Sequence, residues 1–528
     1  MIRTTTKITS NNNIILIFIL FLYVVFLLFF GSKMSPFYAS NEWADPNIYF
    51  NVAKGMLNGK TLYTEIFDHK GPFIFFIYGI GYFISNTSFF GMFLIQIINW
   101  TILLIFVYLT AKLYLNQAFS FIISIIFSLF LMKLIKAGGS AEEFILTWEC
   151  ISLYYFIKFF KKDNLSVHPP IYMLIHGCLC SMTLLTKINL VMFWFFPLLF
   201  IFISILWNKN FKNFFLNVTY FIVGCLIIFS PVIFYLYSHN ALKEAYNIYI
   251  VLNSKYSQIS SVQSTFLLLL KRITFLFIDS CSLLVFPTIG LFYFSIKYIK
   301  SKIASLSIIL SGISFYITIF MAPMFQYYYP IPFLVYDVLG LIGLFLYLQK
   351  YISYHYSVYP LIVIAIISVF LGLSLRLLTN TWVEARILKH DKYLTENLRD
   401  VLIKEKDPTL LNLGFGLGNS LFTTCNIVPN VKYFIKPNLS YRIYPQLRDE
   451  QSSYIKDKKT QFIILPRRVY KDGIRNSYIH VEKTDEFDYY YNLPTLKENY
   501  NLIMIDTIKN RIDENNLEIY YLYKIKNP

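Results

Sequence analysis

Long apolar runs alternate with short polar segments from the start of the chain to Thr379. Runs of roughly 18 or more apolar residues can cross the hydrocarbon core of a bilayer as helices. The pattern predicts spans near 14–30, 89–111, 117–136, 141–160, 170–186, 189–207, 214–237, 281–297, 303–322, 329–348 and 358–378. We therefore expect a polytopic α-helical membrane protein with about eleven transmembrane helices.

Two apolar runs do not fit this pattern. Residues 73–84 form a run of about twelve residues, which is too short for a hydrocarbon core of about 30 Å. Residues 266–277 contain Lys271 and Arg272, and burying each cation in the bilayer costs about 2.5–3.5 kcal/mol. Both runs are expected to lie along the outer membrane interface.

Basic side chains choose the orientation of the spans, because cytoplasmic loops of membrane proteins are rich in lysine and arginine. With residues 73–84 left out of the bilayer, the inner loops contain Lys112, 158–162, Lys209, Lys212, 297–302 and Lys350. The amino terminus is then cytoplasmic, and residues 32–88 form the first outer loop. We read 14–30 as an uncleaved span, because its apolar core exceeds the roughly 7–15 residues of a signal peptide.

Charge becomes dense after Thr379, and apolar runs shrink to strand length. Runs at 410–415, 461–465, 502–506 and 519–523 predict strands between polar, partly helical segments. We expect a transmembrane domain at 1–379 and a soluble α/β domain at 380–528 on the outer face. In the Gly414-Phe-Gly416-Leu-Gly418-Asn419 motif, Asn419 replaces the third glycine of a dinucleotide loop, which favours an ordinary turn after a strand.

Composition agrees with a membrane protein and excludes other classes. The chain is 56% hydrophobic and 15% charged, whereas soluble proteins carry about 25% charged residues. Its net charge of +17 is spread between apolar runs, which indicates contact with lipid headgroups and no nucleic-acid partner. The six cysteines have no metal or redox spacing, and no metal site or cofactor is expected.

The first outer loop gathers the most ionisable side chains. Asp45 precedes Pro46, so an ordinary helix N-cap is one explanation for it. The functional explanation is a carboxylate that accepts a proton from a hydroxyl group. Lys70, in Asp68-His69-Lys70, stands where the chain returns to the interface, either to meet a phosphate or to snorkel.

Other polar groups are expected on the same outer face. Lys187 lies between two apolar runs and needs a carboxylate or an anionic ligand as its partner. Glu142 and Glu143 follow a Gly-Gly turn, where the helix dipole alone favours acidic residues. Tyrosines in the 326–330 segment are typical of an interfacial belt.

The order of these motifs resembles the GT-C superfamily of membrane glycosyltransferases, over roughly residues 14–380. The motifs are Asp45 with Tyr49 and Ala53, His69-Lys70-Gly71-Pro72, Gly138-Gly139 with the glutamates, and Thr186-Lys187, followed by an aromatic-Pro span. They look most like the group of protein O-mannosyltransferases and lipid A aminoarabinose transferases. The resemblance implies transfer of a sugar from a polyprenyl phosphate on the non-cytoplasmic face, without a metal.

The resemblance also implies roles for residues. Asp45 matches the proposed general base, and Lys70 matches the lysine that contacts the donor phosphate. Glu142 or Glu143 matches the acidic residue of the second outer loop. Lys187 matches the lysine that closes the next helix pair, and its charge suits the donor phosphate site. Arg272 is added to the donor phosphate site for its charge. The expected substrate-binding residues are Tyr49, His69, Glu142, Glu143, Gln326, Tyr327 and Tyr328. Two departures from the family pattern are Pro46, in place of a second acid, and Gly71, in place of a first proline.

These observations predict a glycosyltransferase of a bacterial inner (plasma) membrane, acting with inversion on a glycan, lipid or protein acceptor. Rival functions are a transporter or flippase of lipid-linked sugars and a polymerase or ligase of surface polysaccharide. A transporter usually shows internal repeats, and the sequence shows none. Polymerases depend on late outer loops, whereas the acidic loop here comes first. A sensor without catalysis is a third alternative.

Overall fold

A computed structural model describes residues 5–257, 262–279, 281–322, 325–351, 358–379, 395–414, 416–470, 485–509 and 516–526. Its contacts divide the chain into two units, described separately below. The helical unit consists of 1–32, 95–232 and 260–379, and the mixed unit consists of 33–94, 233–259 and 380–528. The division falls inside two helices, α4 and α9.

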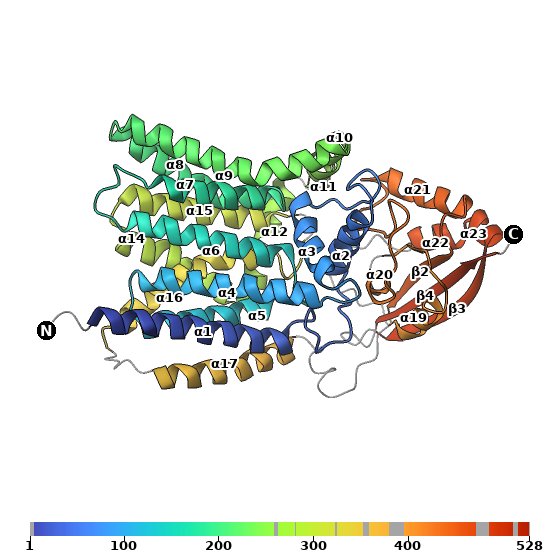
Figure 1. Ribbon diagram of the computed structural model, residues 1–528, viewed down its shortest axis with the longest axis horizontal. Helices are drawn as coiled ribbons and strands as arrows, with labels where there is room; N and C mark the ends of the chain where they lie inside the picture. The colour runs from blue at the N-terminus through green and yellow to red at the C-terminus, as the bar shows by residue number, and fades with distance from the viewer. Residues whose placement is uncertain are drawn as a thin grey trace. The chain divides into compact units, whose positions relative to one another are not determined.

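The helical unit is a bundle whose long helices lie side by side with similar axis directions (Figure 1). Its elements are α1 (Thr5–Gly31), α4 (Phe90–Lys112), α5 (Gln117–Leu134), α6 (Ala141–Phe160), α7 (Pro170–Leu184), η1 (Ile188–Val191), α8 (Met192–Trp207), α9 (Phe211–Ser238), α12 (Val262–Asp279), α13 (Ser282–Thr288), η3 (Ile289–Phe294), α14 (Ser295–Tyr298), α15 (Lys302–Phe320), η4 (Ile331–Leu334), α16 (Val335–Leu348) and α17 (Val358–Thr379). A helix lies on every predicted span, which confirms the helical pattern.

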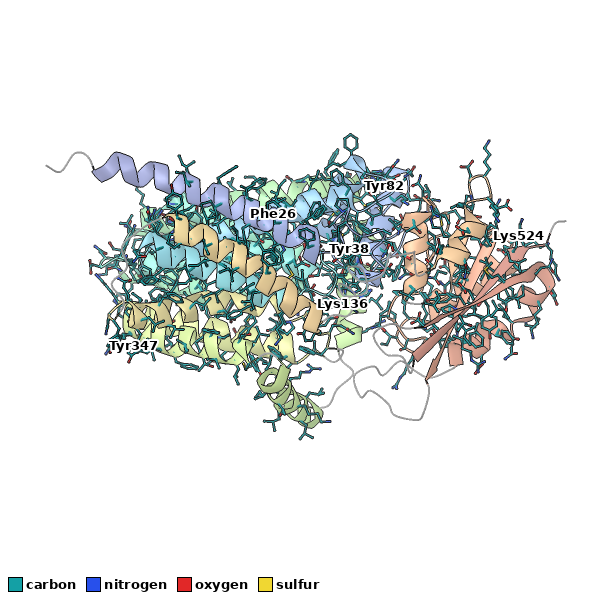
Figure 2. All side chains as sticks on the ribbon, turned by 90° about the horizontal axis from the view of Figure 1, so that it is seen from below. Phe26, Tyr38, Tyr82, Lys136, Tyr347 and Lys524 are labelled. Atoms are coloured by element: carbon teal, nitrogen blue, oxygen red, sulfur yellow. The ribbon has the colours of Figure 1, made fainter. Side chains whose placement is uncertain are left out.

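Seven of the described helical segments are long and apolar enough to cross a membrane, on length and composition. Shorter apolar helices include Pro170–Leu184, Ser282–Tyr298 and Tyr359–Gly372. Outward apolar side chains such as Phe26 on α1, 56% exposed and labelled in Figure 2, suit contact with lipid. The polytopic helical architecture is confirmed, and the number of crossings remains a prediction.

Loops that were assigned to the same membrane face meet at the same end of the bundle. Lys300, in the loop after α14, forms an ion pair with Asp163, in the loop after α6. Lys161 donates a hydrogen bond to the carbonyl of Leu113, in the loop after α4. All of these loops were predicted to be cytoplasmic. Contacts between the predicted outer loops are described with the candidate site.

The mixed unit contains a four-stranded sheet with the strand order β1-β2-β4-β3. Its elements are α2 (Ala44–Leu57), α3 (Pro72–Ile84), α10 (Leu242–Ala245), η2 (Tyr246–Leu252), α11 (Asn253–Ser257), α19 (Glu396–Leu402), β1 (Leu410–Asn412), η5 (Leu417–Asn419), α20 (Ser420–Thr424), α21 (Pro445–Lys456), β2 (Phe462–Tyr470), α22 (Asp485–Tyr491), α23 (Pro494–Asn499), β3 (Tyr500–Lys509) and β4 (Asn516–Ile525).

The four strands lie on the four runs that the sequence predicts. β1 pairs in parallel with β2, while β4 pairs antiparallel with both β2 and β3. The chain between β1 and β2 contains α20 and α21, which supplies the crossover that a parallel pair needs. Buried side chains such as Leu411, Ile463 and Leu522 form the sheet core, and Lys524 of β4 (Figure 2) pairs with Glu405 at 2.7 Å.

The predicted turn after the first strand is also confirmed. β1 ends at Asn412 and is followed by the short η5 helix. The Asn412 side chain donates to Oδ1 of Asn419 at 2.7 Å, so Asn419 closes the turn where a dinucleotide loop would carry glycine. Residue 415, which the predicted strand included, lies outside the described residues.

Candidate active site

Asp45 lies in the first turn of α2 and is partly exposed. The prediction that it caps this helix is wrong, because the helix begins at Ala44 and its N-cap is Trp43. The side chain of Asn47 holds the helix start instead, donating to the carbonyls of Asn41 at 2.5 Å and Trp43 at 2.8 Å. At the described start of α2, no side chain forms a cap hydrogen bond.

Lys70 lies immediately before α3, whose N-cap is Gly71 and whose first residue is a proline. The Tyr63 hydroxyl donates to the Lys70 carbonyl at 2.7 Å. The amide of Asn253, on α11, donates to the carbonyl of His69 at 2.6 Å. These bonds hold the backbone at the end of the loop, and they leave the two side chains partly exposed.

His69 is paired with its neighbour Asp68. The carboxylate of Asp68 lies 3.1 Å from Nδ1 of His69 and accepts a hydrogen bond from its backbone amide at 2.5 Å. Asp68 is buried, at 3% exposure. A buried carboxylate thus lies beside the imidazole on the loop that leads to Lys70.

Aromatic side chains join α2 to α3. The ring of Tyr49, one turn after Asp45, packs against Phe75 and Tyr78, with centroid distances of 6.1 and 5.4 Å. Tyr49 is only 2% exposed, so its ring belongs to the interface between the helices. This contact packs α2, one turn after Asp45, against the first two turns of α3, which Lys70 precedes.

In the helical unit, Lys187 has a carboxylate partner. Its Nζ lies 2.8 Å from Oε1 of Glu142, in the first turn of α6, and 4.0 Å from the ring centre of Tyr329. Glu142 is buried, and the Lys187 side chain is 20% exposed. Lys187 and Glu142 were predicted as separate site residues, and the structure brings them together.

Glu143 has a different environment from its neighbour. It forms a reciprocal capping box with Ser140, with hydrogen bonds of 3.2 and 3.1 Å. Its other oxygen accepts hydrogen bonds from Gln96 at 2.8 Å and from Trp100 at 3.1 Å. This network gives the buried carboxyl group of Glu143 its hydrogen-bond partners, and the contact of Glu143 with substrate stays a prediction.

Arg272, on α12, is buried beneath the segment that precedes α16. Its guanidinium lies 4.6 Å from the ring centre of Phe325 and donates to the carbonyl of Phe320. Phe325 packs on Tyr329, with a centroid distance of 6.1 Å. One short aromatic segment therefore contacts both Arg272 and Lys187. The predicted residues Gln326, Tyr327 and Tyr328 belong to this segment.

Two sets of residues that matter here were not in the predicted site. Tyr329, next to the predicted Tyr328, is the ring that contacts Lys187. It is one of three consecutive tyrosines, and the sequence offers no feature that distinguishes it from the other two. The second set joins α2 to α20, where Nζ of Lys54 donates to the carbonyls of Phe422 at 2.7 Å and Ile427 at 3.4 Å. Burial lowers the pKa of Lys54 to about 7.

The predicted site residues fall into both units. Asp45, Tyr49, His69 and Lys70 belong to the mixed unit; the helical unit contains Glu142, Glu143, Lys187, Arg272, Gln326, Tyr327 and Tyr328. Within the described ranges, no three or more His, Cys, Asp or Glu side chains are grouped as metal ligands. The expected independence from metal stays a prediction.

Part of the chain matches one protein-family model. Residues 69–235 match the family model described as dolichyl-phosphate-mannose-protein mannosyltransferase. A sequence search of curated proteins finds no match.

Solved structures resemble the chain along nearly its whole length. ArnT from Cupriavidus metallidurans bound to undecaprenyl phosphate superposes with a TM-score of 0.59 and 11% identity, covering 97% of this chain and 98% of that one. The structure of ArnT in the apo state superposes with a TM-score of 0.59 at 12% identity. AglB from Archaeoglobus fulgidus, in complex with an inhibitory peptide and a dolichol-phosphate, gives a TM-score of 0.44 at 13% identity, covering 85% and 69%. The chain therefore shares the fold of ArnT over nearly its whole length, and this fold together with the family-model match agrees with the resemblance to GT-C glycosyltransferases seen in the sequence.

Proposed function

We propose that the chain is a glycosyltransferase that moves a sugar from a polyprenyl-phosphate donor to an acceptor hydroxyl at the outer face of a bacterial plasma membrane. The observation that carries the proposal is the fold shared over 97% of the chain with ArnT, which was solved with undecaprenyl phosphate bound. The match of residues 69–235 to a mannosyltransferase family model supports the same chemistry.

The cations of the helical unit suit the phosphate of such a donor. Lys187 and Arg272 both rest against the aromatic segment before α16, with ring distances of 4.0 and 4.6 Å. The phosphate gains negative charge as its bond to the sugar breaks, and preorganised cations stabilise that charge. Glu142 then has a supporting role, because it holds the lysine where the donor phosphate is to bind.

The mixed unit supplies the remaining roles. Asp45 accepts the proton of the acceptor hydroxyl while that oxygen bonds to the anomeric carbon. The bond from this carbon to the phosphate oxygen breaks, and polyprenyl phosphate leaves with the electron pair. A positioned carboxylate typically contributes about 10²–10⁴ to the rate. Lys70 supplies positive charge to the donor phosphate, and a single displacement inverts the anomeric carbon.

The proposed orientation has support in the bundle. Loops rich in lysine meet each other at one end, as the Lys161 and Lys300 contacts illustrate. The segments that carry Glu142, Lys187 and Tyr329 form a second set, whose members also contact each other. We assign the lysine-rich set to the cytoplasm and the second set to the outer face, where an apolar donor from the bilayer and a polar acceptor from water can meet.

Reconstituted protein tests the proposal. Proteoliposomes receive a panel of undecaprenyl-phosphate sugars labelled in the sugar, together with bacterial membrane extract as the source of acceptors. The proposal predicts release of undecaprenyl phosphate and movement of the label into an acceptor. Passage of an intact donor between leaflets would instead identify a flippase, and intact donor in every case would refute the transferase.

A further inference from the structure

A stripe of polar side chains runs along the buried face of α2. Asn47, Asn51 and Lys54 are spaced by four and three residues, which places them on one side of a helix. They are 1%, 1% and 0% exposed. Buried polar groups of this kind need hydrogen-bond partners, and the partners indicate what the stripe is for.

The partners come from α20, far along the sequence. The amide of Asn51 donates to the hydroxyl of Thr423 at 3.0 Å, and this hydroxyl donates to Oδ1 of Asn47 at 2.9 Å. Nζ of Lys54 donates to the carbonyl of Phe422 at 2.7 Å. Asn47 and Thr423 are separated by 376 positions, and Figure 1 shows α20 beside α2.

Asn47 connects Thr423 to the start of α2 through hydrogen bonds. Its oxygen accepts from Thr423, while its amide donates to the carbonyls of Asn41 and Trp43. The Asn41 side chain accepts from the Trp43 amide at 3.0 Å. Asp45 lies between Trp43 and Asn47. One hydrogen-bond network, which includes the Thr423 hydroxyl, therefore fixes the backbone before and after Asp45.

We infer that Thr423 is a positioning residue for the transfer reaction: through Asn47, its hydroxyl fixes the segment that carries Asp45. This inference rests on the proposed function and gives the carboxy-terminal α/β region a part in it. A hydroxyl is needed because it accepts from Asn51 and donates to Asn47 at once. A catalytic group displaced by about 1 Å can lose on the order of 10²-fold in rate.

Three full-length variants test the inference. Thr423→Val has a similar shape without the hydroxyl, and Thr423→Ser restores it. Thr424→Val is the matched control, because the Thr424 hydroxyl bonds within its own helix, to the Ser420 carbonyl at 3.1 Å. For each variant, kcat and the donor KM are measured in proteoliposomes, together with amide hydrogen exchange in residues 41–51 and in the sheet.

Thr423→Val is expected to lower kcat by about 10–100-fold with little change in donor KM. Exchange in 41–51 is expected to speed up at least tenfold, while exchange in the sheet stays unchanged. Thr423→Ser and Thr424→Val are expected to behave as wild type. Unchanged exchange in 41–51 would overturn the inference. A normal kcat despite faster exchange in 41–51 would also overturn it, and so would faster exchange in the sheet.

The exchange measurement needs no substrate. If the wild-type chain transfers no sugar from any donor, the proposed function fails, and with it the catalytic part of the inference. The exchange rates then still decide whether Thr423 orders the segment around Asp45. The two failures are therefore distinguishable.

Discussion

The ammonium group of Lys187 lies 2.8 Å from the carboxylate of Glu142, on a different helix. A lysine between two apolar runs required a partner, and a carboxylate is one of the two partners that the sequence allowed. The ion pair alone would explain the lysine as a structural residue. The donor-site role therefore needs a measurement that separates binding from folding.

Replacing each partner separates the two explanations. Lys187→Met is expected to raise the donor KM by about 10–100-fold, because a hydrogen bond to a charged group is worth about 1.5–3 kcal/mol. Glu142→Gln keeps the lysine and an oxygen that can accept its hydrogen bond, so the donor KM is expected to stay unchanged. KM is measured on folded protein recovered by size exclusion. A donor KM unchanged by Lys187→Met would leave the lysine only its structural role.

Lys54 predicts a pH dependence of stability. Burial lowers its pKa from 10.5 to about 7 in the folded state, while interaction with Cys425 opposes this shift. Between these values the unfolded chain binds more protons, so the free energy of unfolding rises with pH. The gain is absent below about pH 7 and complete above about pH 10.5, and it amounts to a few kcal/mol.

Thermal unfolding at several pH values checks this dependence. The difference in Tm between wild type and Lys54→Met is expected to change steadily from pH 7 to pH 9, in favour of wild type as pH rises. The control is Lys60→Met. The Lys60 side chain also donates to a carbonyl, that of Asn430 at 3.4 Å, but it is not buried. A constant difference between wild type and Lys54→Met would contradict the account.

Gly138 supports the start of α6 and cannot be replaced by alanine without strain. Its φ is +90°, and a Cβ there would lie 2.3 Å from Oγ of Ser32 and 2.8 Å from Nε2 of Gln96. Gln96 in turn holds Glu143. Gly138→Ala is expected to destabilise the protein by roughly 1–2 kcal/mol from its left-handed backbone alone, with the clash added.

The midpoint of thermal unfolding measures this loss. Gly79→Ala in α3 is the matched control, since its Cβ would meet only Leu57 at 3.8 Å and alanine favours helix by about 1 kcal/mol. The two variants should therefore move the midpoint in different directions. A normal midpoint for Gly138→Ala would show that the loop relaxes around the added methyl group.

The sequence predicted the elements well because each follows from a local pattern. Apolar length located the helices, and short apolar runs located the strands around Leu411 and Ile463. It missed the contacts that join distant segments. The start of α2 has Trp43 as its N-cap, and the Asn47 amide bonds to the carbonyl of Trp43, a contact that depends on side-chain orientation.

The candidate site shows the same division. Residue types and motif order brought Asp45, Lys187 and Glu142 into the prediction individually. The residues that contact them could not be derived, because the sequence contains many polar residues of the same type that could be the partner. Thr423 has no local feature that distinguishes it from Thr424, and only the packing of α20 on α2 separates their roles.

The central claim is that Asp45 is the base of a sugar transfer. The most direct test is the rate of transfer from an undecaprenyl-phosphate sugar by Asp45→Asn protein. Glu65→Gln serves as the control, an exposed acid of the same loop that accepts from the Thr61 amide at 2.7 Å. We expect kcat to fall by about 10²–10⁴ for Asp45→Asn, with unchanged thermal unfolding and a normal rate for the control. Transfer at the wild-type rate by the Asp45→Asn protein would contradict the account.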